Sequence, residues 1–129
     1  MRILRLPSNP NIVSQLDKYV KELDETFDLN EKFPDILISL TEAVNNAIIH
    51  GNNLDESKNV EIKVQTIKKG LLFIVKDEGR GFDKGDLCDP TCQENLDKIG
   101  GRGVFIMDQL CDELTFHHNG SVVKMFFKL

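Results

Sequence analysis

The fold is decided by residues 40–52, which read LTEAVNNAIIHGN. Helix-forming and apolar residues dominate this stretch, yet a carboxylate and two amides fall in its middle, namely Glu42, Asn45 and Asn46. Side chains four positions apart lie on one face of a helix, with their Cβ atoms roughly 5–6 Å apart, so Glu42 and Asn46 are predicted neighbours. Such a carboxylate could accept a proton from an attacking hydroxyl or water, and an amide oxygen suits Mg²⁺. The alternative is a polar helix face in solvent.

Two helices are predicted from the apolar spacing around this stretch. One runs from about residue 31 to 50 and ends at Gly51, which is expected to form a left-handed cap. The other is opened by the Ser-Asn-Pro sequence at residues 8–10 and fades near residue 26. Their apolar faces repeat at three and four residues, and the members are Ile12, Leu16, Tyr19, Val20, Leu23, Phe33, Ile36, Leu37, Leu40, Val44 and Ala47.

Alternating or dense apolar runs predict five strands, at about residues 1–6, 59–65, 71–75, 114–116 and 122–129. The first is expected at an edge of the sheet, and the third, which is richest in apolar residues, near its centre. Tight hairpins are predicted at residues 68–70 and 119–120, the second on its Asn-Gly pair. A third helix is expected to begin at Gly101 or Gly103.

This order of elements indicates an α+β fold. We expect a two-layer sandwich in which a mixed, mostly antiparallel sheet carries helices on one face. A length of 129 residues suits a single domain with one core, and that domain would span residues 1–129.

Composition excludes several classes of protein. The net charge of −5 argues against general nucleic-acid binding, which needs a basic footprint. No stretch approaches the roughly 20 apolar residues of a membrane span. Three cysteines, an odd and scattered set, favour a reduced cytoplasmic setting with free thiols. The spacing of Cys88 and Cys92 is uncommon for zinc, and neither these cysteines nor the histidines favour a metal site.

Two glycine-rich loops carry further chemistry. Asp77, Gly79 and Gly81 form a D-x-G-x-G sequence at a strand end, where an Asp could accept a hydrogen bond from an exocyclic amine and glycines allow close backbone approach. A turn closed by an Asp side chain is the plain alternative. Residues 100–103 read GGRG before a helix, where free amide groups and the helix dipole favour an anion. The alternative there is a flexible linker with a helix cap.

The combination of motifs resembles a known fold. E-x-x-x-N-A-x-x-H-G, then D-x-G-x-G-F-D, then G-x-G before a helix are similar to the GHKL ATP-binding fold, and within it to the anti-sigma factor serine/threonine kinase family. The resemblance covers essentially the whole chain. It implies a cytoplasmic, ATP- and Mg²⁺-dependent kinase that phosphorylates a serine or threonine on a small anti-anti-sigma (STAS-type) partner and sequesters a sigma factor. It also suggests a homodimer, to which residues 1–6 could offer an edge strand.

The resemblance further implies a role for each motif residue. Glu42 would be the general base, Asn46 would coordinate Mg²⁺, and Asp77 would recognise the adenine amine. A lid would span about residues 84–99. Gly79 and Gly81 would shape the pocket. The phosphates would be contacted by Gly101, Arg102 and Gly103. Ser121 would lie near the adenine.

Two alternatives to the kinase stay open from the sequence. Phe105 stands where many relatives carry another glycine. A different lid hinge and different phosphate contacts would fit a non-catalytic, nucleotide-gated binding module. An ATP-hydrolysing switch, in which water replaces the protein hydroxyl, is the other. Whether the chain is an enzyme depends mainly on Glu42.

Overall fold

The computed structural model describes residues 2–9, 13–79 and 101–129. Its elements, in chain order, are β1 (Arg2–Pro7), α1 (Val13–Phe27), α2 (Lys32–Asn46), η2 (Ala47–Gly51), β2 (Asn59–Ile67), β3 (Gly70–Lys76), α4 (Gly101–Leu110), β4 (Glu113–His117), η3 (His118–Gly120) and β5 (Val122–Lys128). The predicted Pro10 helix start, Gly81, the lid, Cys88 and Cys92 lie outside the described residues.

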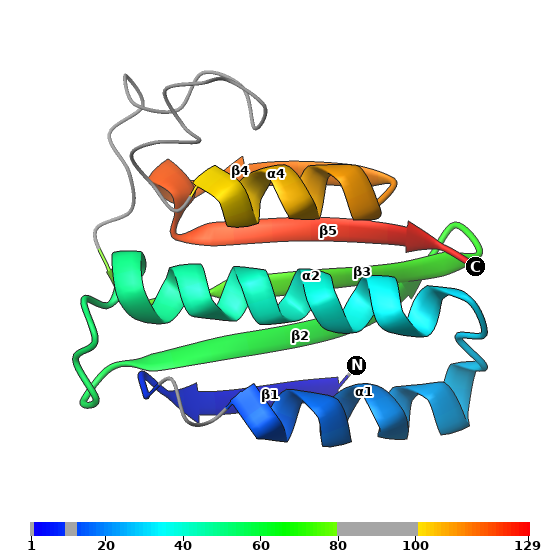
Figure 1. Ribbon diagram of the computed structural model, residues 1–129, viewed down its shortest axis with the longest axis horizontal. Coiled ribbons are helices and arrows are strands. Elements are labelled where there is room, and N and C mark those ends of the chain that lie inside the picture. Colours follow the sequence, from blue (N-terminus) through cyan, green and yellow to red (C-terminus); the bar gives the residue numbers. More distant parts are fainter. Residues whose placement is uncertain (1, 10–12, 80–100) are drawn as a thin grey trace.

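The strands form one sheet in the order β1-β2-β3-β5-β4. Every pairing in it is antiparallel, so the expected mixed character is wrong for the described sheet. The predicted edge position of β1 and central position of β3 are confirmed. Helices α1, α2 and α4 all cover the same face of the sheet (Figure 1), which confirms the two-layer α+β architecture.

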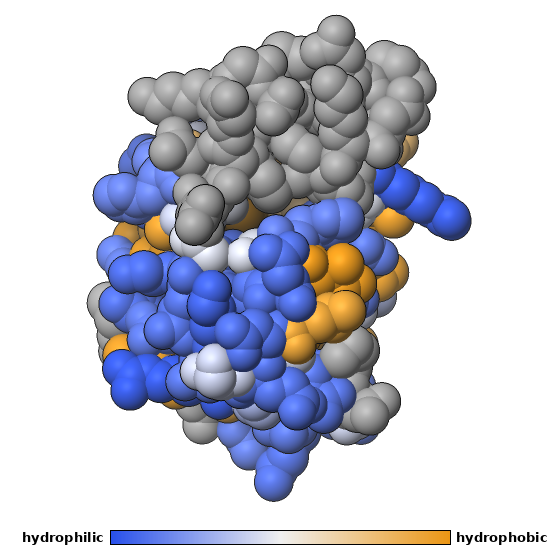
Figure 2. Space-filling view, turned by 90° about the vertical axis from the view of Figure 1, so that its left-hand side faces the viewer, coloured by the Kyte–Doolittle hydropathy of each residue, from blue (hydrophilic) through white to orange (hydrophobic). Residues whose placement is uncertain are grey.

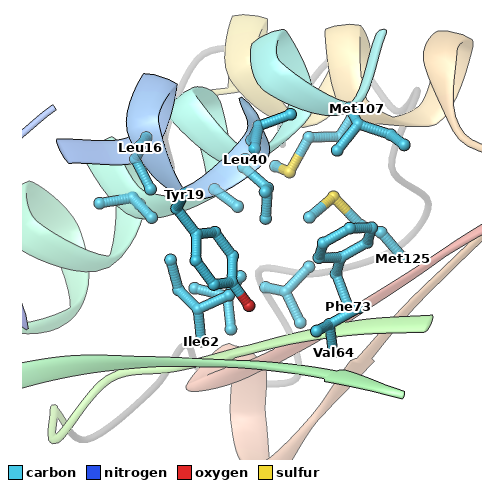
Figure 3. Close-up of a cluster of buried hydrophobic side chains, with 14 of the residues drawn as sticks. Leu16, Tyr19, Leu40, Ile62, Val64, Phe73, Met107 and Met125 are labelled. Atoms are coloured by element: carbon cyan, nitrogen blue, oxygen red, sulfur yellow. The ribbon is translucent and has the colours of Figure 1, made fainter. Parts of the chain in front are cut away.

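The core lies between the helices and the sheet, and Figure 3 shows Tyr19, Leu40 and Met107 pointing from the helices toward Phe73 on the strands. The predicted helix stripes are largely buried, because residues spaced three and four apart share one helix face. The rings of Phe73 and Phe127 meet edge to face, with centroids 5.8 Å apart. Each fully buried large apolar side chain of this kind contributes about 1.5–3 kcal/mol by leaving water.

The two predicted hairpins form, but with different turns. Lys68 and Lys69 both have positive φ, 44° and 61°, and close a two-residue turn between paired strand ends. The β4–β5 connection is longer than the predicted Asn-Gly turn. It spans residues 118–121 and contains a 3₁₀ turn, with φ of 52° at His118 and 90° at Gly120.

The predicted second helix changes character before it ends. It is α-helical to Asn46 and then widens into the π-helical turn η2, where the Asn52 N–H donates to the Ala47 carbonyl at 2.8 Å. The predicted left-handed cap at Gly51 is wrong, since positive φ occurs at Asn53 and Leu54 instead, at 52° and 61°. Single π turns inside helices are frequent at functional sites.

This turn lies at one end of the molecule, together with the ends of β1 and β3 and the starts of β2, β5 and α4 (Figure 1, left). Figure 2 views the molecule from this end, where the described surface is mostly hydrophilic with an apolar patch at its right-hand edge. Among the described residues, no helix combines the length and the apolar character needed to cross a membrane.

Candidate functional site

Glu42 and Asn46 meet the first turn of α4. A Cβ atom built on Gly103 would lie 2.8 Å from Glu42 Oε2 and 3.2 Å from Asn46 Nδ2. Both polar side chains are half-buried, and they lie one helical turn apart on α2. The structure therefore brings together the polar pair and the glycine-rich loop at the start of α4, and the close approach explains why position 103 has no side chain.

Asp77 is a buried carboxylate at the end of β3, only 6% exposed. Its N–H donates to the Ser121 carbonyl at 2.9 Å, and its Oδ1 accepts the Gly79 N–H at 2.8 Å. Burial raises the pKa of Asp77 to about 6, although the Gly79 N–H and the charge of Lys58 oppose this shift. Such a group is an acceptor held in a low-dielectric place, where a hydrogen bond from a ligand amine counts for more than in water.

Two glycines pack against this carboxylate without room for a side chain. A Cβ on Gly51 would lie 2.2 Å from Asp77 Oδ2, and a Cβ on Gly79 would lie 1.8 Å from the Gly51 carbonyl oxygen. The backbone after α2 and the turn after β3 thus touch directly. This contact, rather than a left-handed conformation, is the reason for glycine at position 51.

A narrow hollow, the slot, extends from Asn46 to Asp77 between the helices and the sheet. Its lining is mostly apolar, and Asn46 and Asp77 are its polar members. An apolar slot with a few fixed polar groups suits a flat heteroaromatic ligand that carries an amine donor. The open part has room for about one water molecule, so the walls must move apart to admit a base. The apolar walls are Ala43, Ala47, Val75, Val104, Met107, Phe116 and Val123.

A second, wider hollow reaches Asp77 from the opposite face of the sheet. It is lined by charged groups, among them Arg5, Glu61 and Lys76. Arg5 Nε lies 3.0 Å from Glu61 Oε2, and Lys63 Nζ lies 3.2 Å from Glu61 Oε1. The Glu61 carboxylate therefore already has two cationic partners. The narrow hollow is the better candidate for a nucleotide base, because its lining is mostly apolar and includes Asn46 and Val104, the neighbour of Gly103.

Two other predicted site residues, Ser121 and Arg102, do not line the slot. Ser121 Oγ donates to the His118 carbonyl at 2.9 Å within its own turn, while the Ser121 carbonyl holds the Asp77 N–H. Arg102 is exposed in the first turn of α4, which begins at Gly101. Their predicted ligand contacts stay predictions.

Asn52 was not among the predicted site residues, and the structure shows it fully buried. Its Nδ2 donates to Ser8 Oγ at 2.8 Å and to the Asn59 carbonyl at 3.1 Å, and its Oδ1 accepts the Glu78 N–H at 2.8 Å. One side chain therefore connects the ends of β1 and β3 with the start of β2. The available signal was a polar residue directly after the glycine that ends the helix motif.

Metal chemistry at this end has one candidate ligand. Among the described residues, no group of three or more His, Cys, Asp or Glu side chains could hold a metal ion. The amide oxygen of Asn46 lies close to the backbone of Gly103. It fits Mg²⁺, which takes few protein ligands and keeps waters and phosphate oxygens. Cys111 is a buried free thiol whose pKa is raised to about 12 by burial, so it offers no thiolate.

Comparison with known proteins adds to this geometry. Residues 6–127 match the family described as the histidine kinase-like ATPase domain. The chain is 29% identical to the serine-protein kinase RsbW of Bacillus subtilis (strain 168), across 95% of this chain and 81% of that protein. It is 32% identical to the anti-sigma F factor of Clostridium novyi (strain NT), across 86% and 79%. The chain belongs to the anti-sigma factor serine/threonine kinase family, within the histidine kinase-like ATPase domains.

Proposed function

We propose that this chain is an ATP-dependent serine/threonine protein kinase that acts as an anti-sigma factor, with residues 1–129 forming one ATP-binding domain. The observation that carries the proposal is the convergence of Glu42 and Asn46 on the backbone of Gly103, beside a slot that is lined by Asn46 and Asp77. The proposed general base, the proposed phosphate contacts and the proposed purine acceptor therefore lie next to one another.

Each residue has a defined part in the proposed transfer. Asp77 accepts the hydrogen bond of the adenine amine, and the backbone at the start of α4 faces the phosphates. The protein hydroxyl oxygen attacks the γ-phosphorus, the bond from that phosphorus to the bridging oxygen breaks, and ADP leaves. Glu42 takes the hydroxyl proton. When bound at Asn46, Mg²⁺ would neutralise charge on the phosphates.

The proposed phosphoacceptor is a serine or threonine of a small anti-anti-sigma (STAS-type) protein, and the second partner is a sigma factor. Two relatives carry names of this kind, serine-protein kinase and anti-sigma F factor. Phosphorylation would weaken the first complex and return the kinase to the sigma factor. We place this cycle in the cytoplasm, and we propose a homodimer that uses β1, the strand at the sheet edge.

The test is phosphate transfer from ATP to a co-encoded STAS protein in the presence of Mg²⁺. Glu42→Ala should lower the transfer rate by about 10²–10⁴-fold, the usual contribution of general base catalysis. ATP affinity, measured by calorimetry, should stay within about threefold, because Glu42 does not line the base slot. The proposal that the chain is a kinase is overturned if the wild type binds ATP with Mg²⁺ but transfers no phosphate to that partner.

A non-catalytic, nucleotide-gated binding module is the second candidate. Phe105, 41% exposed in the first half of α4, favours it, because a bulky ring there could replace a glycine hinge with a contact surface. Under this alternative, Glu42→Ala would leave ATP-dependent sequestration of the sigma factor unchanged, and the wild type would show no transfer. Phosphate transfer by the wild type that is lost in Glu42→Ala decides in favour of the kinase.

A further inference from the structure

We propose that Asn52 is a positioning residue that holds Asp77 in place for the purine amine and thereby sets the preference for adenine over a base without that amine. This inference rests on the proposed nucleotide site. It adds a residue that never touches the ligand, and it names the property of the ligand that depends on it.

The first step is the hydrogen bonding of Asn52 itself. Its buried amide uses both ends, because Nδ2 donates to Ser8 Oγ and to the Asn59 carbonyl, while Oδ1 accepts the Glu78 N–H. A buried amide with these partners has one favoured orientation, since turning it over would place donors against donors and acceptors against acceptors. The position of the Glu78 N–H is therefore fixed relative to the ends of β1 and β2.

The second step is the effect on Asp77, the residue before Glu78. The N–H of Asp77 is held by the Ser121 carbonyl at 2.9 Å, and the next N–H along the chain is held by Asn52 at 2.8 Å. Both peptide groups that flank Asp77 are thus anchored, one by the turn before β5 and the other by the residue after η2. The carboxylate is then oriented by the Gly79 N–H on Oδ1, while Oδ2 lies against Gly51.

The third step connects this anchoring to the π turn. Asn52 follows Gly51 directly, and its own N–H donates to the Ala47 carbonyl, which closes η2. Ala47 also lines the slot. One residue therefore fixes both the wall of the slot and the peptide that carries its acceptor. A site that hydrogen-bonds a ligand amine rejects the analogue without that amine only while the acceptor stays in place.

The experiment compares ATP with inosine triphosphate, which carries a carbonyl in place of the amine, by calorimetry on the full chain. In the wild type ATP should bind at least about tenfold more tightly, the value of one well-placed hydrogen bond. Asn52→Ala should lower this ratio to about one to threefold, mainly by weakening ATP. In kinase assays it should raise the KM for ATP while kcat at saturation stays within about threefold, because Glu42 is untouched.

Ser8→Ala is the matched control. It removes one partner of Asn52 Nδ2 but leaves the Asn59 and Glu78 bonds, so stability should fall while the ATP preference stays within about twofold of wild type. Should Asn52→Ala fail to fold, Asn52→Asp, which keeps an acceptor for the Glu78 N–H, is expected to retain the preference despite lower stability.

Three results would overturn the inference. They are an unchanged ATP preference in Asn52→Ala, an equal loss of preference in Ser8→Ala, and loss of preference in a folded Asn52→Asp protein. Each of these leaves the proposed kinase standing if the wild type still prefers ATP and transfers phosphate. A wild type that binds neither nucleotide overturns both proposals together.

Discussion

The two ends of the central strand β3 both bring glycine against neighbouring groups, but the neighbours differ. At the hairpin end, a Cβ on Gly70 would lie 2.4 Å from the Phe127 carbonyl oxygen and 2.7 Å from the ring of Phe126. At the opposite end, a Cβ on Gly79 would lie 1.8 Å from the Gly51 carbonyl oxygen and 3.1 Å from Asp77 Oδ1. Neither position therefore has room for a Cβ atom.

What differs is the chemistry that the close approach protects. Around Gly70 the ring covers a bare stretch of backbone, which is a packing contact that serves stability alone. Around Gly79 the same closeness holds a buried carboxylate with a raised pKa beside an apolar slot. A tight glycine contact becomes a sign of function only when its neighbours include polar groups that the fold itself leaves available to a ligand.

Alanine at these two glycines should give the largest difference. Gly79→Ala is expected to cost about 2–4 kcal/mol of unfolding free energy and to weaken ATP at least about 100-fold, because the clash is with rigid backbone beside Asp77. Gly70→Ala should cost a comparable free energy, but the folded protein should bind ATP as the wild type does. Urea unfolding and calorimetry measure both quantities. Equal loss of ATP affinity in the two variants would contradict the distinction.

Asp77 provides the next largest effect, through pH. Its pKa in the folded protein, about 6, lies above the ordinary value of 3.8, so the folded state favours the neutral acid. Stability from this group is present below about pH 4 and is lost as the pH rises through 6. Asp77→Asn should therefore be more stable than the wild type at pH 8, by up to about 3 kcal/mol, with no gain at pH 3.5.

Unfolding of the two proteins without nucleotide, followed across pH 3.5 to 8, measures this difference directly. The same variant should bind ATP poorly, because the charged acceptor is gone. Stability and binding would then move in opposite directions at pH 8, as expected where a functional group is held at a cost to the fold. A difference that does not grow with pH would show that burial does not strain this carboxylate.

Gly103→Ala should separate chemistry from stability more gently. The nearest atom to the new Cβ is Oε2 of Glu42, the far end of a flexible side chain, and Ala is a better helix former than Gly. Stability should change by less than about 1 kcal/mol, while phosphate transfer falls about 10- to 100-fold as Glu42 is displaced. Thermal unfolding and initial transfer rates measure the two effects. An unchanged rate would remove Glu42 from the reaction path.

The sequence carried most of the fold, because its periods are local. Spacings of three and four assign α1 and α2, alternation assigns β2, and a dense apolar run assigns β3. The two-layer arrangement follows from burying their apolar faces. The end of α2 was mispredicted for the opposite reason. Gly51 is a natural helix cap by local rules, but the carboxylate that excludes its side chain comes from Asp77, far along the chain.

The site shows the same division. Glu42 and Asn46 are four apart, so their neighbourhood was predictable, whereas their contact with Gly103 depends on how α4 packs on α2. Asn52 was missed because its partners are distant: Ser8 lies 44 positions away and Glu78 lies 26. Burial of a polar side chain is a tertiary property, and the place of Asn52 directly after Gly51 does not by itself distinguish a buried amide from a loop residue.

The smallest expected effect separates the two hollows that reach Asp77. Arg5 lines only the outer, charged hollow, where it is largely exposed and pairs with Glu61. Arg5→Ala should change stability by less than about 1 kcal/mol, as exposed ion pairs usually do. It should leave ATP affinity unchanged if the base enters from the helix side. Calorimetry measures this, and Val104→Phe, which fills the inner slot, is the opposing variant. Weakened ATP binding in Arg5→Ala with normal binding in Val104→Phe would move the base to the outer face, because each change alters one hollow and leaves the other intact.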